Sequence, residues 1–546
     1  MKILTTILLS MFTTIVLIPI LKEIALKFNI LDIPNQRKIH EFPIPRIGGI
    51  AMATGAFIPV LFWVPMKPYL ISIIIGSGIV VIAGMVDDIR KLGFKTKFAA
   101  QILAALIVIL YGNIKIVDLG FFFPDGFILP DLASIPLTIF IIVGVTNAIN
   151  LSDGLDGLAG GISLLSLICI GYLSYILKIH PFIVISAALI GSIFGFLRYN
   201  TFPATIFMGD AGSQLLGFIA ICMSLTLTQK SRHLSPFLIF LIMGFPLIDT
   251  FSVVAQRIMS GKSPFVADKN HLHHKLMDLG LYHSESVILV YVIHAIFICL
   301  AFIFRFYPDW FILTIYLTLF SILLTSTLVA IRCGWRFKRS YFLDKIIQGR
   351  LQNLKEKNYI IKFSFKIVEV GFYSLLLFSC FLPENIPTNL SLITLAFLIF
   401  VLAIWKLKRE WIDNTLEIGF YLLIPFLIYL SHINMASWMN DYFLMPYNLS
   451  FGILTFFVIL TLKYTRRKKG FKFSPMDILI LFVAFVVPNL PDENIKKYHM
   501  GLVAAKIIVF FFTHEVVVGE LRIDLKWFRF TTILAFLIIG LRGLIG

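Results

Sequence analysis

Asparagine, aspartate and glycine are concentrated in one short stretch, residues 147–161, which reads NAINLSDGLDGLAGG. Its polar side chains recur every three residues, at Asn147, Asn150, Asp153 and Asp156. On a helix this spacing places them along one face. Carboxylate and amide oxygens are hard ligands that suit Mg²⁺ and its bound water, or the polar groups of a nucleotide or sugar. This density of polar residues favours a binding site over a solvated helix end.

Two adjacent aspartates form a second candidate site in the segment MVDDIRK. Side chains of neighbouring helical residues point roughly 100° apart, so one of Asp87 and Asp88 can hold a metal while the other meets a substrate or a lysine. Two carboxylates held close together repel each other unless they share a cation. The pair therefore predicts a metal or a titrating acid, and an ordinary ion pair between Asp87 and Lys91 is the alternative.

Asp210 lies in the turn FMGDAGS, directly before an apolar segment. The free amides at the amino terminus of such a helix attract an anion. A carboxylate at the same place hinders anion binding unless a metal joins the two. Asp210 is therefore a candidate metal ligand, and a helix N-cap is the alternative.

Three histidines occur in the segment HLHHK, at His271, His273 and His274, within a long basic loop. Zinc sites are expected to show cysteine or an H-x₃-H spacing, and neither accompanies these histidines. Binding of phosphate by histidine and lysine fits the basic surroundings better. A solvated loop is the alternative.

The amino-acid composition indicates whether these polar segments lie in a water-soluble protein or in a membrane protein. Of the 546 residues, 59% are hydrophobic and only 14% are charged, which indicates a polytopic membrane protein. Unbroken apolar runs without strand alternation predict an all-α fold. Eleven transmembrane helices are expected near residues 3–21, 48–65, 69–86, 98–111, 134–149, 158–177, 182–197, 213–228, 236–252, 286–304 and 310–331. The net charge of +17 favours anionic membrane lipids as partners over nucleic acid.

The loops between these eleven segments alternate in charge. Odd-numbered loops carry lysine and arginine, so the positive-inside rule places them in the cytoplasm and the amino terminus outside. All four polar segments fall at odd-numbered loops. A single composite site at the cytoplasmic face is therefore expected, with the chemistry of phosphoryl or phosphoglycosyl transfer.

The polar segments occur in a fixed order, which resembles that of the polyprenyl-phosphate N-acetylhexosamine-1-phosphate transferases, in glycosyltransferase family 4. The resemblance covers roughly residues 1–330. It is carried by RKIHEFPIPRIGG, GMVDDIRKLGFKTKF, NAINLSDGLDGLAGG, FLRYNTFPATIFMGDAGS, PLIDT and HLHHKLMDLG. Among these transferases, the HLHHK and PRIGG segments look like those of the bacterial enzymes that use UDP-GlcNAc.

The resemblance implies a reaction and a set of roles. Undecaprenyl phosphate would attack the β-phosphorus of a UDP-N-acetylhexosamine, giving a lipid-linked diphosphate sugar and UMP at the cytoplasmic face of the bacterial plasma membrane. The cofactor would be Mg²⁺, with Mn²⁺ as an alternative. The implied catalytic residues are Asp87, Asp88, Asp153 and Asp156; the substrate-binding residues are Asn147, Asn150, Lys95, His271, His273 and His274; the metal ligands are Asp210, Asn150 and Asp88.

Residues beyond the resemblance divide into two parts. A basic stretch at 332–366 is expected to be a cytoplasmic linker that touches anionic headgroups. Residues 367–546 contain seven more apolar segments, near 367–382, 389–405, 415–431, 447–463, 477–488, 501–513 and 528–544, and form a second membrane module. No dense polar motif marks this module, and helix-end solvation accounts for His514, Glu515 and Glu520. Binding of lipid product, recruitment of a glycosyltransferase and homodimer formation all stay open.

An ion-coupled transporter is the alternative function, because acids in membrane segments and glycine-broken helices are also expected there. The acids cluster at one face rather than at the membrane midplane, and no inverted repeat is visible. These two features favour the transferase, in a domain spanning residues 1–331.

Overall fold

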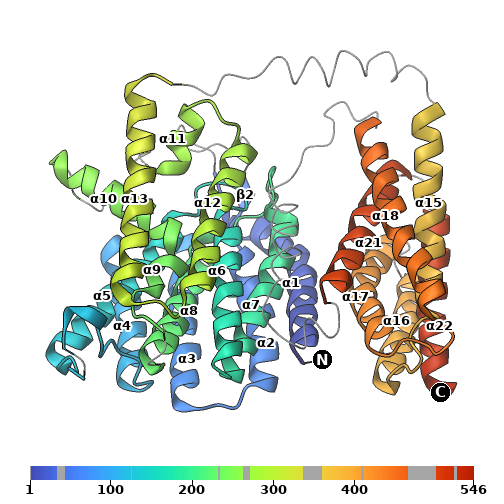
Figure 1. Cartoon of the computed structure of the whole chain (residues 1–546), viewed down its shortest axis with the longest axis horizontal. Coiled ribbons are helices and arrows are strands. Elements are labelled where there is room, and N and C mark those ends of the chain that lie inside the picture. Colours follow the sequence, from blue (N-terminus) through green and yellow to red (C-terminus); the bar gives the residue numbers. More distant parts are fainter. Residues whose placement is uncertain are drawn as a thin grey trace. The chain divides into compact units, whose positions relative to one another are not determined.

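The computed structural model describes residues 2–33, 43–124, 126–231, 234–261, 263, 271–335, 359–407, 411–464, 500–521 and 525–545. These residues fall into two compact units (Figure 1). The first unit comprises the described residues from 2 to 335, and the C-terminal unit comprises those from 359 to 545. Most of the predicted basic linker lies outside the described residues.

The first unit is helical apart from one short strand pair, β1 (Leu31–Asp32) with β2 (Ile44–Pro45). Its helices are α1 (Lys2–Lys27), α2 (Gly48–Trp63), α3 (Pro68–Arg90), α4 (Phe94–Leu110), α5 (Asp131–Leu151), α6 (Leu158–Ile176), α7 (His180–Asn200), α8 (Gly209–Lys230), α9 (Leu238–Ile242), α10 (Gly244–Met259), α11 (Leu272–Asp278), α12 (His283–Phe304) and α13 (Asp309–Arg332), with a 3₁₀ turn η1 (Gly120–Phe122). Every predicted apolar segment here is helical, although the ninth is broken between α9 and α10.

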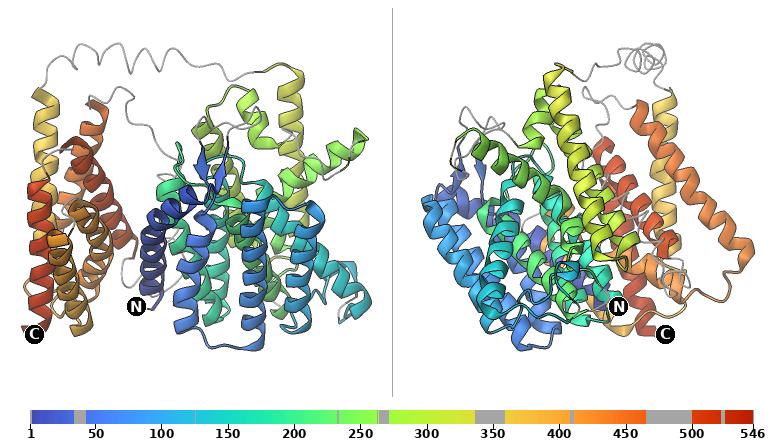
Figure 2. Two further views of the ribbon diagram at one scale, coloured as in Figure 1. Left: turned by 180° about the vertical axis from the view of Figure 1, so that it is seen from behind. Right: turned by 60° about the vertical axis from the view of Figure 1, so that its left-hand side comes forward.

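Twelve helices of the described residues are long and apolar enough to cross a membrane, which confirms the all-α polytopic prediction. Eight of them lie in the first unit, where Figure 2 shows them running side by side. The apolar helix α2, with 16 residues, is shorter than these twelve.

The helix α8 forms the centre of the first unit. The most apolar stretch of this helix is entirely buried, and α2, α3, α5 and α6 pack around it. Glycines bring two of these neighbours into contact with its backbone. A Cβ atom added to Gly49 of α2 would lie 2.1 Å from the amide nitrogen of Gly212, and one added to Gly84 of α3 would lie 2.5 Å from that of Ala211. The end of α3 is therefore held against the first turn of α8.

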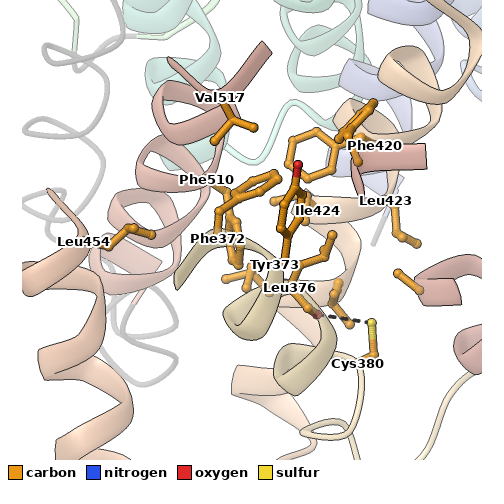
Figure 3. Packing of buried hydrophobic residues seen from close by; sticks show 14 of the residues in the cluster. Phe372, Tyr373, Leu376, Cys380, Phe420, Leu423, Ile424, Leu454, Phe510 and Val517 are labelled. Carbon is orange, nitrogen blue, oxygen red and sulfur yellow. Dashed lines mark hydrogen bonds between the residues drawn. The ribbon is translucent and has the colours of Figure 1, made fainter. Parts of the chain in front are cut away.

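The C-terminal unit is a second helical bundle. Its described helices are α15 (Tyr359–Ser379), α16 (Thr388–Leu407), α17 (Ile412–Ile433), α18 (Asp441–Tyr464), α21 (Met500–Leu521) and α22 (Lys526–Ile545). Figure 3 shows part of the core of this bundle, where Phe372, Leu376, Phe420, Ile424 and Phe510 are fully or almost fully buried. Six of the seven predicted segments coincide with these helices, and the segment at 477–488 lies outside the described residues.

Candidate active site

The predicted site residues gather at one end of the first unit. The helices α3 and α5 end there, α8 begins there, and Figure 1 shows β2 and α11 at that same upper end. The strand β2 leads into two backbone hydrogen bonds, from the amides of Gly48 and Gly49 to the carbonyls of Phe207 and Met208. These bonds fix the segment PRIGG against the turn that begins α8.

A lysine joins two of the predicted aspartates. The Nζ atom of Lys97, in the first turn of α4, lies 2.6 Å from Oδ2 of Asp87 and 2.7 Å from Oδ2 of Asp210. Buried carboxylates at this separation repel each other, and one ammonium group between them offsets that repulsion. The other oxygen of Asp87, Oδ1, is buried and accepts no hydrogen bond from the described residues. The site is therefore a shared cation position with one unsatisfied carboxylate oxygen.

The neighbouring Asp88 points elsewhere, as the angle between adjacent helical residues predicts. Its Oδ1 and Oδ2 atoms accept from the backbone amides of Asp210 and Ala211 at 3.2 and 3.3 Å. Gly209, with φ +69, makes room for this carboxylate, since an added Cβ would lie 2.4 Å from Asp88 Oδ2. Nη1 of Arg46 lies 3.7 Å from Asp88 Oδ1, and Nη2 of the same arginine lies 2.7 Å from Asp32 Oδ1. Asp88 thus caps α8, so Asp87 fits the predicted metal-ligand role better.

A chain of carboxamides continues from Asp210 toward the interior. Gln214 Nε2 donates to Asp210 Oδ2 at 3.1 Å, and its Oε1 accepts from Gln101 at 3.0 Å. Gln101 Oε1 in turn accepts from Asn147 Nδ2 at 2.7 Å. Because each oxygen in the chain accepts from the next amide, Gln214 must present its NH₂ group to Asp210. Asn147, predicted to bind substrate, therefore orients Asp210 through two glutamines.

Asn150, the second asparagine of the segment 147–161, contacts the first turn of α8. Asn150 Nδ2 donates to Ser213 Oγ at 2.8 Å, and Ser213 Oγ donates to the carbonyl of Gly209 at 2.9 Å. Because its NH₂ group faces both Ser213 and Asp210, Asn150 keeps its carbonyl oxygen as an acceptor or ligand.

The two aspartates that follow α5 differ in their surroundings. Asp153 is half-buried, and desolvation together with the negative charge of Asp210 raises its pKa to about 7. Asp156 Oδ2 accepts from the amide of Ala204 at 2.9 Å, and its own amide donates to His283 Nε2 at 3.2 Å. Asp153 is therefore suited to proton transfer near neutral pH, whereas Asp156 ties together two loops of the site.

The histidine segment is anchored by an aspartate of α10. Asp249, only 1% exposed, contacts His271 Nδ1 at 2.8 Å and accepts from the amide of Leu272 at 2.7 Å. His273 packs on Gly154, where an added Cβ would lie 2.3 Å from His273 Nε2. Burial lowers the pKa of His273 to about 3, so this imidazole is neutral at physiological pH. His274 is half-buried with its ring 4.4 Å from that of His273.

One predicted lysine lies apart from the cluster. Lys95 is exposed and, among the described residues, forms no ion pair with the aspartates. The lysine that does so is Lys97, which the sequence prediction missed together with Gln101, Gln214 and Asp249. The spacing of four between Lys97 and Gln101, and between Asp210 and Gln214, is the signal that could have found the lysine and the two glutamines, because such pairs share a helix face. Asp249 lies in the segment PLIDT, which carries the resemblance.

A hard divalent cation fits the donor set at the shared cation position. Within the described residues, no three His, Cys, Asp or Glu side chains form a complete ligand set. Two carboxylates nevertheless suit Mg²⁺, which keeps several waters and takes further ligands from substrate phosphates. The unsatisfied oxygen of Asp87, beside Asp210, is the observation that carries this fit.

Comparison with known proteins places these residues in a family. The model of "Glycosyl transferase family 4" matches residues 70–228, which include the aspartates at 87, 88, 153, 156 and 210. The "Probable undecaprenyl-phosphate N-acetylglucosaminyl 1-phosphate transferase" of Bacillus subtilis (strain 168) is 37% identical over 302 residues, covering 54% of this chain and 83% of the relative.

Two further relatives are also similar to this chain. The "Decaprenyl-phosphate N-acetylglucosaminephosphotransferase" of Mycolicibacterium smegmatis is 34% identical over 305 residues, covering 50% of this chain and 74% of the relative. The "Undecaprenyl-phosphate alpha-N-acetylglucosaminyl 1-phosphate transferase" of Escherichia coli (strain K12) is 30% identical over 366 residues, covering 63% and 93%. With its polar segments assembled around the first turn of α8, the chain belongs to glycosyl transferase family 4.

Proposed function

We propose that the protein transfers GlcNAc-1-phosphate from UDP-GlcNAc to undecaprenyl phosphate, giving undecaprenyl-diphosphate-GlcNAc and UMP. The observation that carries the proposal is the cation position shared by Asp87 and Asp210 at the first turn of α8. The names of the relatives supply the donor and acceptor classes. A cation held by carboxylates at a membrane helix end suits a reaction between two phosphate groups.

The reaction is a phosphoryl transfer. An oxygen of the lipid phosphate attacks the β-phosphorus of UDP-GlcNAc, the bond from that phosphorus to the bridging oxygen breaks, and UMP leaves with the bridging oxygen. Catalysis of such a step consists mainly of positioning and charge neutralisation. Lys97 and Arg46 are the cations nearest the aspartates, and they are placed to neutralise phosphate oxygens.

Proton transfer falls to Asp153. A lipid phosphate monoester still holds a proton on part of its population near neutral pH, because its second pKa is about 6. The carboxylate of Asp153, with a pKa of about 7, can accept that proton before attack. The contact between Asp249 and His271 holds the histidine segment beside Gly154, the residue after Asp153. From there His273 and His274 can contact the diphosphate or the sugar.

Mg²⁺, with Mn²⁺ as the alternative, would be held by Asp87 and Asp210, with the amide oxygen of Asn150 as a further ligand. When bound, the ion supplies neutralisation of the diphosphate charge. The protein's own residues position the ligands of this ion. Asp88 fixes the start of α8, and the carboxamide chain fixes the orientation of Asp210.

The positive-inside pattern supports a site on the cytoplasmic face of the bacterial plasma membrane, where a UDP-sugar is supplied. The lipid-linked product would start a cell-envelope polysaccharide. A homodimer and contacts with anionic lipids remain predictions. The observations of the first unit favour the transferase over an ion-coupled transporter, because the acids meet at one end of the helices rather than midway along them.

The position of the transferred phosphorus provides the test. Full-length protein in detergent is given undecaprenyl phosphate and UDP-GlcNAc carrying ³²P in its β-phosphate. Transfer of the sugar phosphate moves the label into the lipid extract and releases unlabelled UMP. A glycosyl transfer that leaves the label in UDP, or recovery of intact UDP-GlcNAc from well-folded protein, would refute the proposal. UDP-GalNAc in parallel decides which N-acetylhexosamine is used.

A further inference from the structure

The charged side chains at the two ends of the C-terminal unit are balanced differently. Where α17 and α22 begin, Arg529 forms a double ion pair with Asp413 at 2.6 and 2.8 Å. Early in α15, Lys366 pairs with Glu369 at 2.9 Å. At the other end lie Lys506 and Arg542, and neither has a carboxylate within ion-pair distance among the described residues. Among the described residues, these two cations therefore form no ion pair.

Of the two cations, Lys506 is the stronger evidence for a bound anion, because it is buried. Its residue is only 3% exposed, inside a bundle of apolar helices. Its Nζ atom lies 3.1 Å from His432 Nε2 and 4.2 and 5.5 Å from the ring centres of Tyr447 and Phe451. When Lys506 is charged, its ammonium group donates this hydrogen bond to a neutral His432 ring, which supplies no negative charge. Aromatic faces attract a cation without neutralising it.

Polar groups connect the two cations. Tyr447, whose ring lies beneath Lys506, shares a hydrogen bond of 3.1 Å with Ser379 through its hydroxyl group. The next residue, Cys380, accepts from Arg542 Nη1 at 2.7 Å through its carbonyl, and Arg542 Nη2 donates to the carbonyl of Pro383 at 2.8 Å. A series of contacts thus runs from Lys506 of α21 through Tyr447 of α18 to the C-terminal end of α15, which Arg542 of α22 also contacts.

A net positive charge buried in a membrane protein is costly unless an anion compensates it. We propose that this end of the C-terminal unit, centred on Lys506, binds a phosphate or diphosphate group, and that the group belongs to a lipid or to a free anion. The site does not depend on the transfer reaction, although the proposed lipid product carries a group of this class. The hydroxyl groups of Ser379 and Tyr447 supply the neutral donors that phosphate oxygens accept from.

The test is ligand-induced stabilisation of the full-length protein in detergent. Wild type, Lys506→Met, Lys506→Arg and the control Lys366→Met, whose side chain is 68% exposed, are heated with each of three probes. The probes are undecaprenyl phosphate, inorganic pyrophosphate and uncharged undecaprenol. The Asp210→Asn background is used throughout, so that binding at the first unit is altered equally in every sample.

We expect a phosphate-bearing probe to stabilise wild type, Lys506→Arg and Lys366→Met, and Lys506→Met to weaken this binding roughly 10- to 100-fold. Stabilisation that Lys506→Met loses and that the lipid alone gives identifies a headgroup, and such stabilisation by pyrophosphate identifies a free anion. Without any probe, Lys506→Met should melt at the same temperature or higher, since replacing an unbalanced buried charge by an apolar side chain removes a cost.

Two results would overturn the inference. Undecaprenol could stabilise wild type as strongly as undecaprenyl phosphate, or Lys506→Met could bind the charged probes as tightly as wild type. A variant that unfolds is replaced by Lys506→Gln, for which the same two comparisons are decisive. UMP release by the same lysine variants with Asp210 intact should stay at the wild-type rate, whereas failure of the proposed reaction would remove release from every sample alike.

Discussion

Each unit contains a buried or half-buried lysine, and the two lysines differ in what surrounds them. Lys97 lies between Asp87 and Asp210, so its charge is more than compensated. Lys506 faces a neutral histidine and two aromatic rings. The first arrangement holds negative charge ready for cations and phosphate together, whereas the second is a buried amine with no ion-pair partner among the described residues, which suits an anion. Local charge balance thus separates a reaction centre from a binding site within one chain.

Asp210→Asn should have the largest effect. It removes one of the two carboxylates of the shared cation position while keeping the shape of the side chain. We expect UMP release to fall by about 1,000-fold, the upper range for loss of one electrostatic group in an active site. Asp131→Asn is the control, because Asp131 is an exposed partner of Lys115 at the start of α5. Comparable losses in both variants would contradict the role given to Asp210.

Lys97→Met sharpens the comparison of the two lysines. We expect about a 100-fold loss of UMP release, because Asp87 and Asp210 lose the ammonium group between them and the phosphates lose a cation. Lys95→Met and Lys506→Met serve as matched controls and should stay within about 2-fold of wild type, the range expected where no active-site charge is removed. A loss in Lys95→Met that equals the loss in Lys97→Met would show that the first turn of α4 is placed differently.

Gln101→Leu tests the carboxamide chain. Without Gln101, the Gln214 oxygen loses its donor, and this amide can turn its oxygen toward Asp210. Loss of one buried hydrogen bond predicts about a 10-fold fall in kcat, with the KM for UDP-GlcNAc nearly unchanged. Gln101→Glu should be at least as damaging, since a carboxylate cannot donate to Gln214. If both variants instead raised the KM for UDP-GlcNAc and left kcat unchanged, Gln101 would be assigned to substrate binding.

Asp153→Asn should change the dependence of stability on pH. The folded protein raises the pKa of Asp153 to about 7, whereas the unfolded value is about 3.9. Between these values the folded state holds a proton that the unfolded chain releases, so this carboxyl group lowers stability progressively as pH rises from about 4 to 7. The melting temperature of wild type should therefore fall more than that of Asp153→Asn between pH 5 and pH 7.5. Parallel curves would show that Asp153 has an ordinary pKa.

Much of this arrangement could be predicted from the sequence. Hydropathy alone located every helix that packs around α8, and the alternation of loop charge predicted that the four polar segments would meet. The opening segment and the segments around Asp87 and Asp210 were visible because several polar residues follow one another in a short loop. Such density is a local property, so it needs no knowledge of the fold.

The residues that were missed are single polar side chains within apolar helices. Lys97 and Gln101 gain their partners only when α4 packs beside α3, α5 and α8, and Lys506 only when α21 meets α17 and α18. The choice between Asp87 and Asp88 likewise depends on the rotation of α3, which the close contact of Gly84 with Ala211 sets. Helix packing, rather than local pattern, determines each of these contacts.

The Mg²⁺ concentration required for UMP release by Asp87→Asn and Asp88→Asn tests the central claim most directly. Asp87 shares the cation position with Asp210, so its replacement should raise the half-saturating Mg²⁺ concentration at least about 10-fold, as loss of a charged ligand predicts. Asp88 caps α8, so its replacement should lower the melting temperature and leave the Mg²⁺ requirement within about 2-fold of wild type. A raised Mg²⁺ requirement in Asp88→Asn, with none in Asp87→Asn, would contradict this account.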